Sequence, residues 1–138
     1  MDTMSGVHRL DAQARDRLIA HLEAALSCRT DVVFGLIFGS FVDRDAFRDV
    51  DLGIWTTESA GPCVDVDLAA VLSGELDLPI DVRRLNDASV PFLFHALRGR
   101  AIAVRDERRL ADLMERTARD YHDRAPLLRL ATREAFAR

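Results

Sequence analysis

The sequence contains no lysine, because all 19 basic residues among its 138 amino acids are arginine. This absence excludes a Schiff-base lysine, a general-base lysine and the P-loop motif that ends in Gly-Lys-Ser/Thr. Cysteine is also scarce. Cys28 and Cys63 stand alone, without CxxC spacing or a neighbouring His pair, so neither a zinc site nor a disulfide framework is indicated.

Long apolar runs are missing as well. No segment approaches the ~20 residues of a membrane span, and residues 1–16 lack the hydrophobic stretch of a signal peptide. We therefore expect a cytoplasmic protein that does not insert into a membrane. The net charge is −4, with 17 Asp against 6 Glu, which argues against direct nucleic-acid binding driven by electrostatics.

The composition that remains is typical of one soluble domain, with 49% apolar and 30% charged residues. We predict a single domain over residues 1–138, with a core over about 11–106 and a helical tail over about 107–138. The first ten residues are expected to form a loose leader. Nine arginines and seven acids alternate between positions 105 and 138, a mixed-charge surface suited to a protein partner.

Hydrophobic periodicity predicts an α/β (α+β) fold, a small mixed sheet flanked by helices. Apolar spacing indicates a helix over residues 11–27 that Asp11 caps, and short β-branched runs indicate strands over 31–38 and 50–56. Pro62 is placed to open a helix reaching about residue 72, and Asp87 to cap a helix over 90–97. Further strands are expected over 79–85 and 100–104, and a further helix over 106–121. Pro126 either kinks that helix or starts a last one.

The most informative stretch is FGSFVDRDAFRDVDL, residues 38–52. Gly39-Ser40 ends a buried strand, and Asp49-Val50-Asp51 enters the next one. Side chains alternate along a strand, so Asp49 and Asp51 point the same way, ~7 Å apart along the chain. Two such carboxylates suit a hard divalent cation. Glycine allows a phosphate close to the backbone, and a helical turn beginning at Ser40 would favour an anion further.

A third acid, Asp81, stands between two apolar residues of the predicted strand 79–85. If that strand lies beside the one that contains Asp51, Asp81 projects onto the same face. Three carboxylates there can hold two metal ions, and the third acid can also receive a proton from an attacking hydroxyl.

Gly39-Ser40, Asp49-x-Asp51 and Asp81 together resemble the signature of the DNA polymerase β-like nucleotidyltransferase superfamily, over roughly residues 31–106. The short chain is similar to the minimal nucleotidyltransferase antitoxins of that superfamily, and its helical tail is similar to their C-terminal helix. The resemblance implies a polymerase β-like nucleotidyltransferase fold. It also implies an antitoxin that transfers AMP from ATP to a tyrosine of a partner HEPN-domain toxin, with which it would form a hetero-oligomer.

The same resemblance implies a role for each residue of the signature. Asp49 and Asp51 would bind two Mg²⁺ ions. Asp81 would ligate the catalytic ion and help to deprotonate the tyrosine hydroxyl. Gly39 and Ser40 would hold the triphosphate of ATP. Catalysis of this kind depends on positioning and charge neutralisation, which three carboxylates and two metal ions supply without lysine.

The loop after Gly39-Ser40 departs from the family pattern. It spans eight residues, 41–48, where about ten are usual, and Val42-Asp43-Arg44 stands where a small residue, Arg and Gly are common. Either Arg44 or Arg48 can supply positive charge for phosphate. The shortened loop keeps open a non-catalytic antitoxin that neutralises its toxin by binding. A nucleotidyltransferase acting on a small, aminoglycoside-like molecule is a third hypothesis, for which the helical tail offers little substrate-binding area.

Several residues that carry similar chemistry are interpreted as structural. Asp65-Val66-Asp67-Leu68 repeats the DVDL string of residues 49–52, but it follows Pro62 and is expected in the first turn of a helix, where acids complement the dipole. Trp55 is expected in the core. The four histidines have no ligand spacing and are also interpreted as structural.

Overall fold

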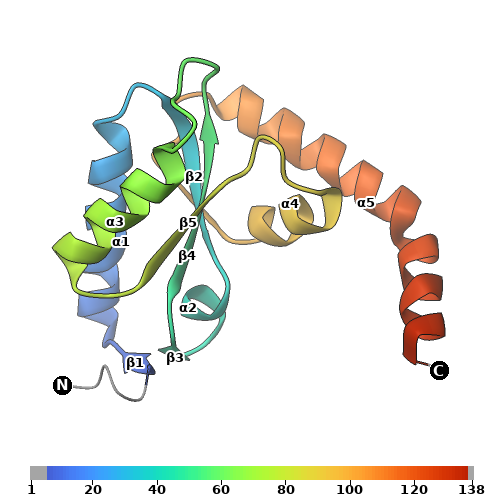
Figure 1. Cartoon of the computed structure of the whole chain (residues 1–138), viewed down its shortest axis with the longest axis horizontal. Helices are drawn as coiled ribbons and strands as arrows, with labels where there is room; N and C mark the ends of the chain where they lie inside the picture. The colour runs from blue at the N-terminus through green and yellow to red at the C-terminus, as the bar shows by residue number, and fades with distance from the viewer. Residues whose placement is uncertain (1–5, 137–138) are drawn as a thin grey trace.

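The computed structural model describes residues 6–136, and for residues 124–136 it describes the backbone alone. Five helices and six strands lie within that range (Figure 1). The helices are α1 (Ala12–Ser27), α2 (Ser40–Asp43), α3 (Val64–Leu76), α4 (Val90–Leu97) and α5 (Glu107–Phe136). The strands are β1 (His8–Arg9), β2 (Val32–Phe38), β3 (Ala46–Phe47), β4 (Val50–Thr56), β5 (Ile80–Arg84) and β6 (Arg100–Ile102).

The main sheet has four strands in the order β5-β4-β2-β6. β2 pairs antiparallel with both β4 and β6, whereas β4 pairs parallel with β5. A parallel neighbour requires a crossover, and α3 supplies it between β4 and β5. The predicted fold class, a small mixed sheet flanked by helices, is therefore confirmed.

Helices cover both faces of the sheet and divide the core into two clusters. α1 and α3 lie side by side on one face, whereas α4 and α5 cover the other (Figure 1). The first cluster includes Leu22 and Leu72 from the helices and Leu52 from β4, all fully buried. The second includes Phe34 and Leu36 of β2. Such two-sided cover explains the nearly continuous apolar runs of the central strands.

A small ribbon lies outside the main sheet. β1 pairs antiparallel with β3, so that His8 lies opposite Phe47 and their rings approach to 5.7 Å. The prediction of a loose leader over the first ten residues is wrong for this part of it, and residues 1–5 lie outside the described range. The short strands contain little hydrophobic periodicity, so the sequence alone gave no signal for them.

The predicted helix boundaries are mostly correct, and the differences have local causes. Asp11 caps α1 as expected, but Ser89 rather than Asp87 caps α4, since the Ser89 hydroxyl accepts from the Phe92 amide. α3 begins after Pro62 and continues four residues beyond the predicted end, where Asp77 adopts a left-handed conformation. The Asp65 and Asp67 pair lies in the first turn of α3 as predicted.

The C-terminal helix is longer than the sequence pattern indicated. α5 continues through Pro126 as one helix to Phe136, and its axis turns in its C-terminal half (Figure 1). Its first part is fixed against α4, where the rings of Phe94 and Tyr121 stack with centroids 3.9 Å apart. Trp55 packs against the second core cluster, where its ring stacks on the ring of Phe34 with centroids 6.0 Å apart.

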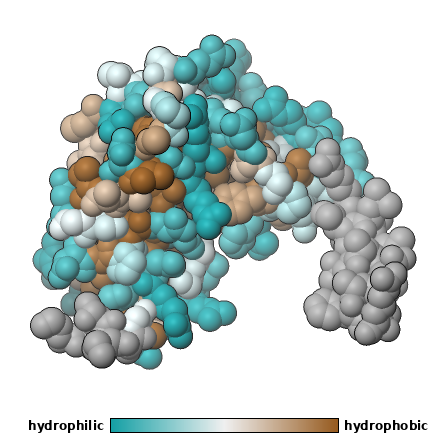
Figure 2. Space-filling view, in the orientation of Figure 1, coloured by the Kyte–Doolittle hydropathy of each residue, from teal (hydrophilic) through white to brown (hydrophobic). Residues whose placement is uncertain are grey.

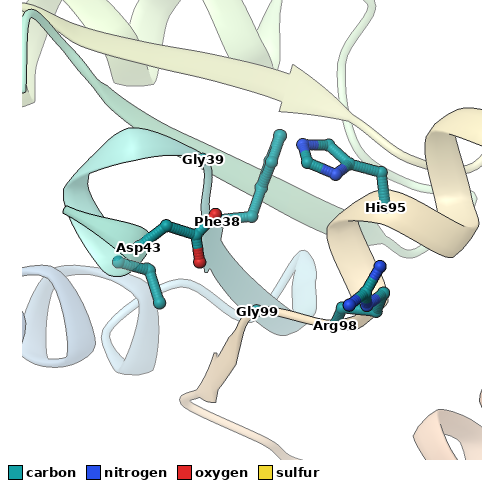
Figure 3. A pocket seen from close by; sticks show the side chains of 7 residues that line it. Phe38, Gly39, Asp43, His95, Arg98 and Gly99 are labelled. Atoms are coloured by element: carbon teal, nitrogen blue, oxygen red, sulfur yellow. The ribbon is translucent and has the colours of Figure 1, made fainter.

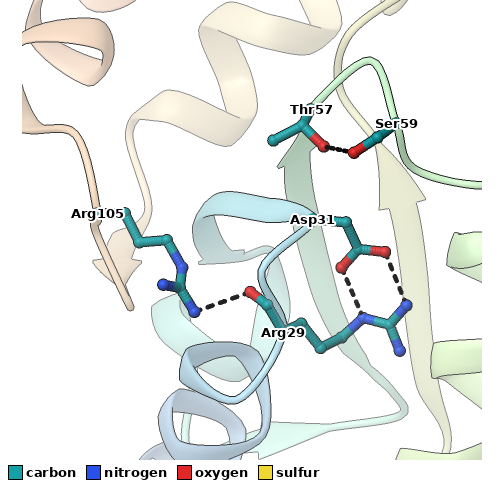
Figure 4. A network of polar contacts seen from close by, with 5 residues as sticks. All are labelled: Arg29, Asp31, Thr57, Ser59 and Arg105. Atoms are coloured by element: carbon teal, nitrogen blue, oxygen red, sulfur yellow. Dashed lines mark hydrogen bonds and ion pairs between the residues drawn. The ribbon is translucent and has the colours of Figure 1, made fainter.

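A polar network joins the end of α1 to the segment that leads into α5 (Figure 4). Arg29 donates two hydrogen bonds to the Asp31 carboxylate, at 2.9 and 3.0 Å, and these bonds lower the pKa of Asp31 below its ordinary value. Arg105 donates to the Arg29 carbonyl oxygen at 2.8 Å and to that of Ser27. The network therefore links the segment just before α5 to the C-terminal end of α1.

Two neighbouring residues of α3 test the position of the core. Leu72 is fully buried, whereas Val71 is 55% exposed. We expect Leu72→Ala to lower the free energy of unfolding by about 2–5 kcal/mol, since it leaves a cavity. Val71→Ala should change it by less than about 0.5 kcal/mol. Urea denaturation measures both, and equal losses would contradict the assignment of the buried face.

Candidate active site

The candidate residues gather at one edge of the main sheet. β4 and β5 are parallel and both begin at this edge, where the antiparallel β2 ends. The register places Asp51 directly beside Asp81, and Phe38 beside Asp51. Adjacent strands lie about 4.8 Å apart, so residues separated by 30 positions in the sequence become immediate neighbours.

Strand alternation orients the two acids of the Asp49-Val50-Asp51 segment. Val50 is fully buried in the first core cluster, which directs Asp49 and Asp51 to the opposite face. Both aspartates are half-buried, and the Asp81 side chain is 43% exposed. Asp49 and Asp81 therefore both lie near enough to act electrostatically on Asp51, and Asp81 remains accessible from outside.

Gly39 occupies a conformation and a space that suit only glycine. Its φ of 80° and ψ of −159° lie in a region that other residues avoid. A Cβ atom there would also overlap Oδ2 of Asp51. The turn after β2 consequently passes directly against the carboxylate, and α2 begins at the next residue, Ser40. The helical turn considered from the sequence is thus present.

Electrostatic repulsion within the cluster is visible at Asp51. Burial, followed by the negative charges of Asp49 and Asp81, raises the pKa of Asp51 from 3.8 to about 6, while Arg83 and His95 oppose the rise. Carboxylates held together in this way are costly in the absence of a cation. Such a cost is typical of functional sites, where charges are arranged for a ligand rather than for stability.

The donor set suits Mg²⁺, although the side chains do not close around a metal position by themselves. Within residues 6–123, where side chains are described, no three His, Cys, Asp or Glu groups are placed to hold one ion. Asp81 instead pairs with Arg83 at 3.4 Å. Mg²⁺ binds through one or two carboxylates completed by water and substrate phosphate, and the unneutralised charge around Asp51 fits that mode.

A pocket of about 380 Å³ lies beside Asp49, and we call it the Ser40–Arg48 pocket. Its lining includes Ser40, Asp49 and the arginines of the connecting loop, Arg44 and Arg48. Sequence analysis left open which of the two arginines supplies positive charge, and both line this pocket. The pocket therefore combines a hydroxyl, two guanidinium groups and a carboxylate, which together suit a phosphate group with its bound metal.

Sequence analysis missed the participation of α4. A second pocket, of about 150 Å³, is lined by Phe38, Gly39, Val42, Asp43, His95, Arg98 and Gly99. In Figure 3 the Phe38 ring lies between the Gly39 turn and His95, and the two rings meet edge-on at 5.5 Å. His95 has no ligand spacing in the sequence. Only the packing of α4 against β2 brings its exposed ring to the site.

Arg15 of α1 holds the loop that follows Gly39-Ser40. It donates hydrogen bonds to the carbonyl oxygens of Arg44 at 2.7 Å, of Asp45 at 3.2 Å, and of Phe41. Its guanidinium also lies 4.5 Å from the centre of the Phe41 ring. Because the planar guanidinium of Arg15 binds three carbonyl oxygens, the shortened loop is held in place although it lacks the glycine common in the family pattern.

Because burial and neighbouring charges disfavour the ionised Asp51 carboxylate, we expect the protein to become more stable when this charge is removed. The folded pKa is raised, so the folded state gains stability from protonation at low pH and loses it as the pH rises through about 6. We expect Asp51→Asn to be more stable than the wild type at pH 7 by about 1 kcal/mol, because solvent screens the half-buried group. Near pH 4 the difference should disappear.

Thermal denaturation at several pH values measures this effect, with Asp67→Asn as the matched control. Asp67 is exposed in the first turn of α3. Its neutralisation should lower the free energy of unfolding by about 0.3–1 kcal/mol, because the favourable interaction with the helix dipole is lost. An Asp51→Asn variant less stable than the wild type at pH 7 would contradict the interpretation.

The contacts of Arg15 predict an effect on nucleotide binding. Arg15→Ala frees the loop that lines the Ser40–Arg48 pocket. The resemblance implies that Ser40 of this pocket holds the triphosphate of ATP, so we expect ATP affinity to fall about tenfold, or about 1.4 kcal/mol. Calorimetric titration measures the affinity, and a melting curve confirms that the variant is folded at the assay temperature. Arg17→Ala changes an exposed arginine of the same helix and should bind as the wild type does. Equal affinities in all three proteins would exclude the loop-holding role.

Comparison with known proteins places this geometry in a family. The family model for polymerase beta nucleotidyltransferases matches residues 20–108. No curated protein matches the chain in sequence. Among solved structures, the complex of tri-AMPylated Shewanella oneidensis HEPN toxin with MNT antitoxin contains a similar chain, with 18% identity, a TM-score of 0.64, and coverage of 91% of this chain and 98% of that one.

Two further structures share the fold. The toxin–antitoxin pair MntA–HepT matches with 16% identity and a TM-score of 0.62, over 93% of this chain and all of that one. A toxin–antitoxin structure with AMP-PNP matches with 17% identity and a TM-score of 0.63, over 94% and 100%. The match to the family model spans both Asp49-x-Asp51 and Asp81. This chain belongs to the polymerase beta nucleotidyltransferase family.

Proposed function

We propose that this protein is the antitoxin of a HEPN/MNT pair and transfers AMP from ATP to a tyrosine of its partner toxin. The central observation is the register of β4 and β5, which sets Asp51 beside Asp81 under the Gly39 turn. One similar chain occurs in a complex of an MNT antitoxin with a tri-AMPylated HEPN toxin, another in the toxin–antitoxin pair MntA–HepT, and a third in a toxin–antitoxin structure with AMP-PNP. These relatives support ATP as donor and a HEPN protein as acceptor.

Each residue of the site has a distinct task in this proposal. Asp49 and Asp51 would hold two Mg²⁺ ions, and Asp81 would also ligate the catalytic one. When bound, these ions neutralise the triphosphate and make the α-phosphorus more electrophilic. Gly39 lets the triphosphate approach the backbone, and Ser40 donates to it. Arg44 and Arg48 add positive charge from the wall of the adjoining pocket.

Asp81 is placed to accept the proton of the attacking hydroxyl. Its carboxylate lies at the open side of the cluster, with 43% of the side chain exposed, so a tyrosine from another chain can reach it. Attack of the tyrosine oxygen on the α-phosphorus forms the new P–O bond, and pyrophosphate leaves. In-line geometry of this kind gains most of its rate from positioning and electrostatics.

α5 offers the surface for the partner. We propose one domain over residues 1–138, in which the core over about 11–106 contains the site and the tail over about 107–138 contacts the toxin. Figure 2 shows a largely hydrophilic surface over the first half of α5, in keeping with its interleaved arginines and acids. Among the described helices, none has the length and apolar character needed to cross a membrane.

A transfer assay tests the function. The chain is incubated with Mg²⁺, ATP labelled at the α-phosphate and the product of the neighbouring gene, which the proposal expects to be a HEPN toxin. We expect label on the toxin with the wild type and at least a hundredfold less with Asp49→Ala or Asp51→Ala, since removal of a charge-stabilising group costs about 10²–10³ in rate. Asp67→Ala, from the repeated DVDL string, should label normally.

The same variants separate catalysis from inhibition by binding alone. The loop without a small-Arg-Gly segment is the observation that favours a non-catalytic antitoxin. Under that alternative, cells that produce the toxin survive equally well with the wild type, Asp49→Ala or Asp51→Ala. Under our proposal, both variants lose protection while still forming the complex, which co-purification measures.

A further inference from the structure

The second pocket of the site, here called the Arg98 pocket, lies across Asp51 from Asp81. The strand order β5-β4-β2-β6 gives the Asp51 strand the Asp81 strand on one side and β2 on the other. Phe38, at the end of β2, is the register partner of Asp51 on that second side. Gly99, just before β6, packs against Phe38. The pocket that these residues line with Arg98 therefore lies on the β2–β6 side of the carboxylates.

Gly39 joins the Arg98 pocket to the carboxylate cluster. It lines the pocket, and it lies so close to Asp51 that a Cβ atom on it would overlap the carboxylate. His95 also lines the pocket and is near enough to act electrostatically on Asp51. The pocket and the carboxylate cluster therefore share the Gly39 turn as a common wall.

The cation of this pocket is not engaged within the described part of the chain. The Arg98 side chain is exposed and makes no hydrogen bond or ion pair within residues 6–123, and its guanidinium lies 5.9 Å from the centre of the Phe94 ring. Asp43 is the one carboxylate of the lining, and it does not pair with Arg98. In Figure 3 Arg98 and His95 lie on one side of the pocket and Asp43 on the other. The guanidinium is therefore available to an anion.

The proposed reaction calls for an anion-binding group on this side of the cluster. In an in-line displacement, the attacking and leaving oxygens lie on opposite sides of the α-phosphorus. The attacking tyrosine oxygen lies on the side of Asp81, which takes its proton, so pyrophosphate leaves toward the β2–β6 side. Negative charge grows on the pyrophosphate as its bond to the α-phosphorus breaks, and a preorganised guanidinium stabilises that charge.

We propose that Arg98 binds the β- and γ-phosphates of ATP and stabilises the departing pyrophosphate, with the His95 ring as a second hydrogen-bond donor. The inference rests on the function proposed above and adds the C-terminal end of α4 to the groups that act on the substrate. The tyrosine oxygen forms the new bond to the α-phosphorus, and its proton passes to Asp81. Pyrophosphate takes the electron pair of the broken bond, and Arg98 keeps its protons throughout.

Pyrophosphate binding tests the assignment without turnover. Calorimetric titration with pyrophosphate in the presence of Mg²⁺ gives the affinity without toxin or ATP. We expect Arg98→Gln to bind about tenfold more weakly than the wild type, since a charge-assisted contact is lost, and Arg98→Lys to recover part of the loss. Arg100→Gln is the matched control, because Arg100 is also exposed but does not line the pocket. It should bind as the wild type does.

Asp43 supplies a variant whose effect has the opposite sign. Its carboxylate lies in the same pocket and repels an anion, so Asp43→Asn should strengthen pyrophosphate binding by about twofold to fivefold. Arg98→Gln and Asp43→Asn each remove one charge from an exposed side chain. A general loss of structure would weaken binding in both variants, whereas the proposed contact weakens one and strengthens the other.

The transfer assay adds a kinetic test. Arg98→Gln should lower the kcat of AMP transfer about tenfold or more, because the charge that Arg98 stabilises develops in the transition state. Inhibition by added pyrophosphate should weaken by a similar factor. Arg100→Gln should leave both quantities unchanged.

The possible results separate this inference from the function on which it rests. If AMP is transferred but the wild type does not bind pyrophosphate, or Arg98→Gln binds it no more weakly than Arg100→Gln does, the role of Arg98 is overturned and the function stands. If pyrophosphate binds through Arg98 but the wild type transfers no AMP, the proposed function is overturned instead.

Discussion

The parallel pairing of β4 with β5 is the constraint on which the site depends. It places Asp51 and Asp81 side by side, and burial, together with the charges of Asp49 and Asp81, raises the pKa of Asp51 to about 6. Three free carboxylates in water would move apart because their negative charges repel one another. They remain together because the opposite faces of the same strands are buried, with Val50, Leu52 and Ile80 in the first core cluster. Hydrophobic burial thus offsets an electrostatic cost that a cation-bound nucleotide would relieve.

The backbone around this cluster is fixed in part by residues outside the strands that contain the carboxylates. Gly39 lets the turn after β2 pass against Asp51, and Arg15 reaches from α1 to hold the following loop by three carbonyl oxygens. The β1–β3 ribbon closes the same end of the molecule. A loop that lacks the glycine of the family pattern is therefore held by an arginine of α1.

Arginine supplies the positive charge around the carboxylates. Arg44 and Arg48 line the pocket beside Asp49, and Arg83 pairs with Asp81 at 3.4 Å. Because the lysine-free sequence supplies all positive charge as arginine, these side chains are planar, multidentate donors of a kind that suits phosphate.

The sequence by itself determined the elements and the faces of their residues. Short β-branched runs predicted the buried strands β2 and β4, and alternation predicted the common direction of Asp49 and Asp51. The helix start after Pro62 predicted that Asp65 and Asp67 belong to a helix and not to the site. It also indicated Gly39-Ser40 as a phosphate-binding turn, which stays a prediction.

Tertiary structure alone decided which elements meet. The sequence could state only conditionally that Asp81 lies beside Asp51, because strand order depends on how α3 crosses the sheet. Arg15 and His95 carry no periodic signal for the contacts that they make, and β1 is too short to show one. Their contacts join segments far apart in the chain, and such pairings follow from the packing of the whole core rather than from any local pattern.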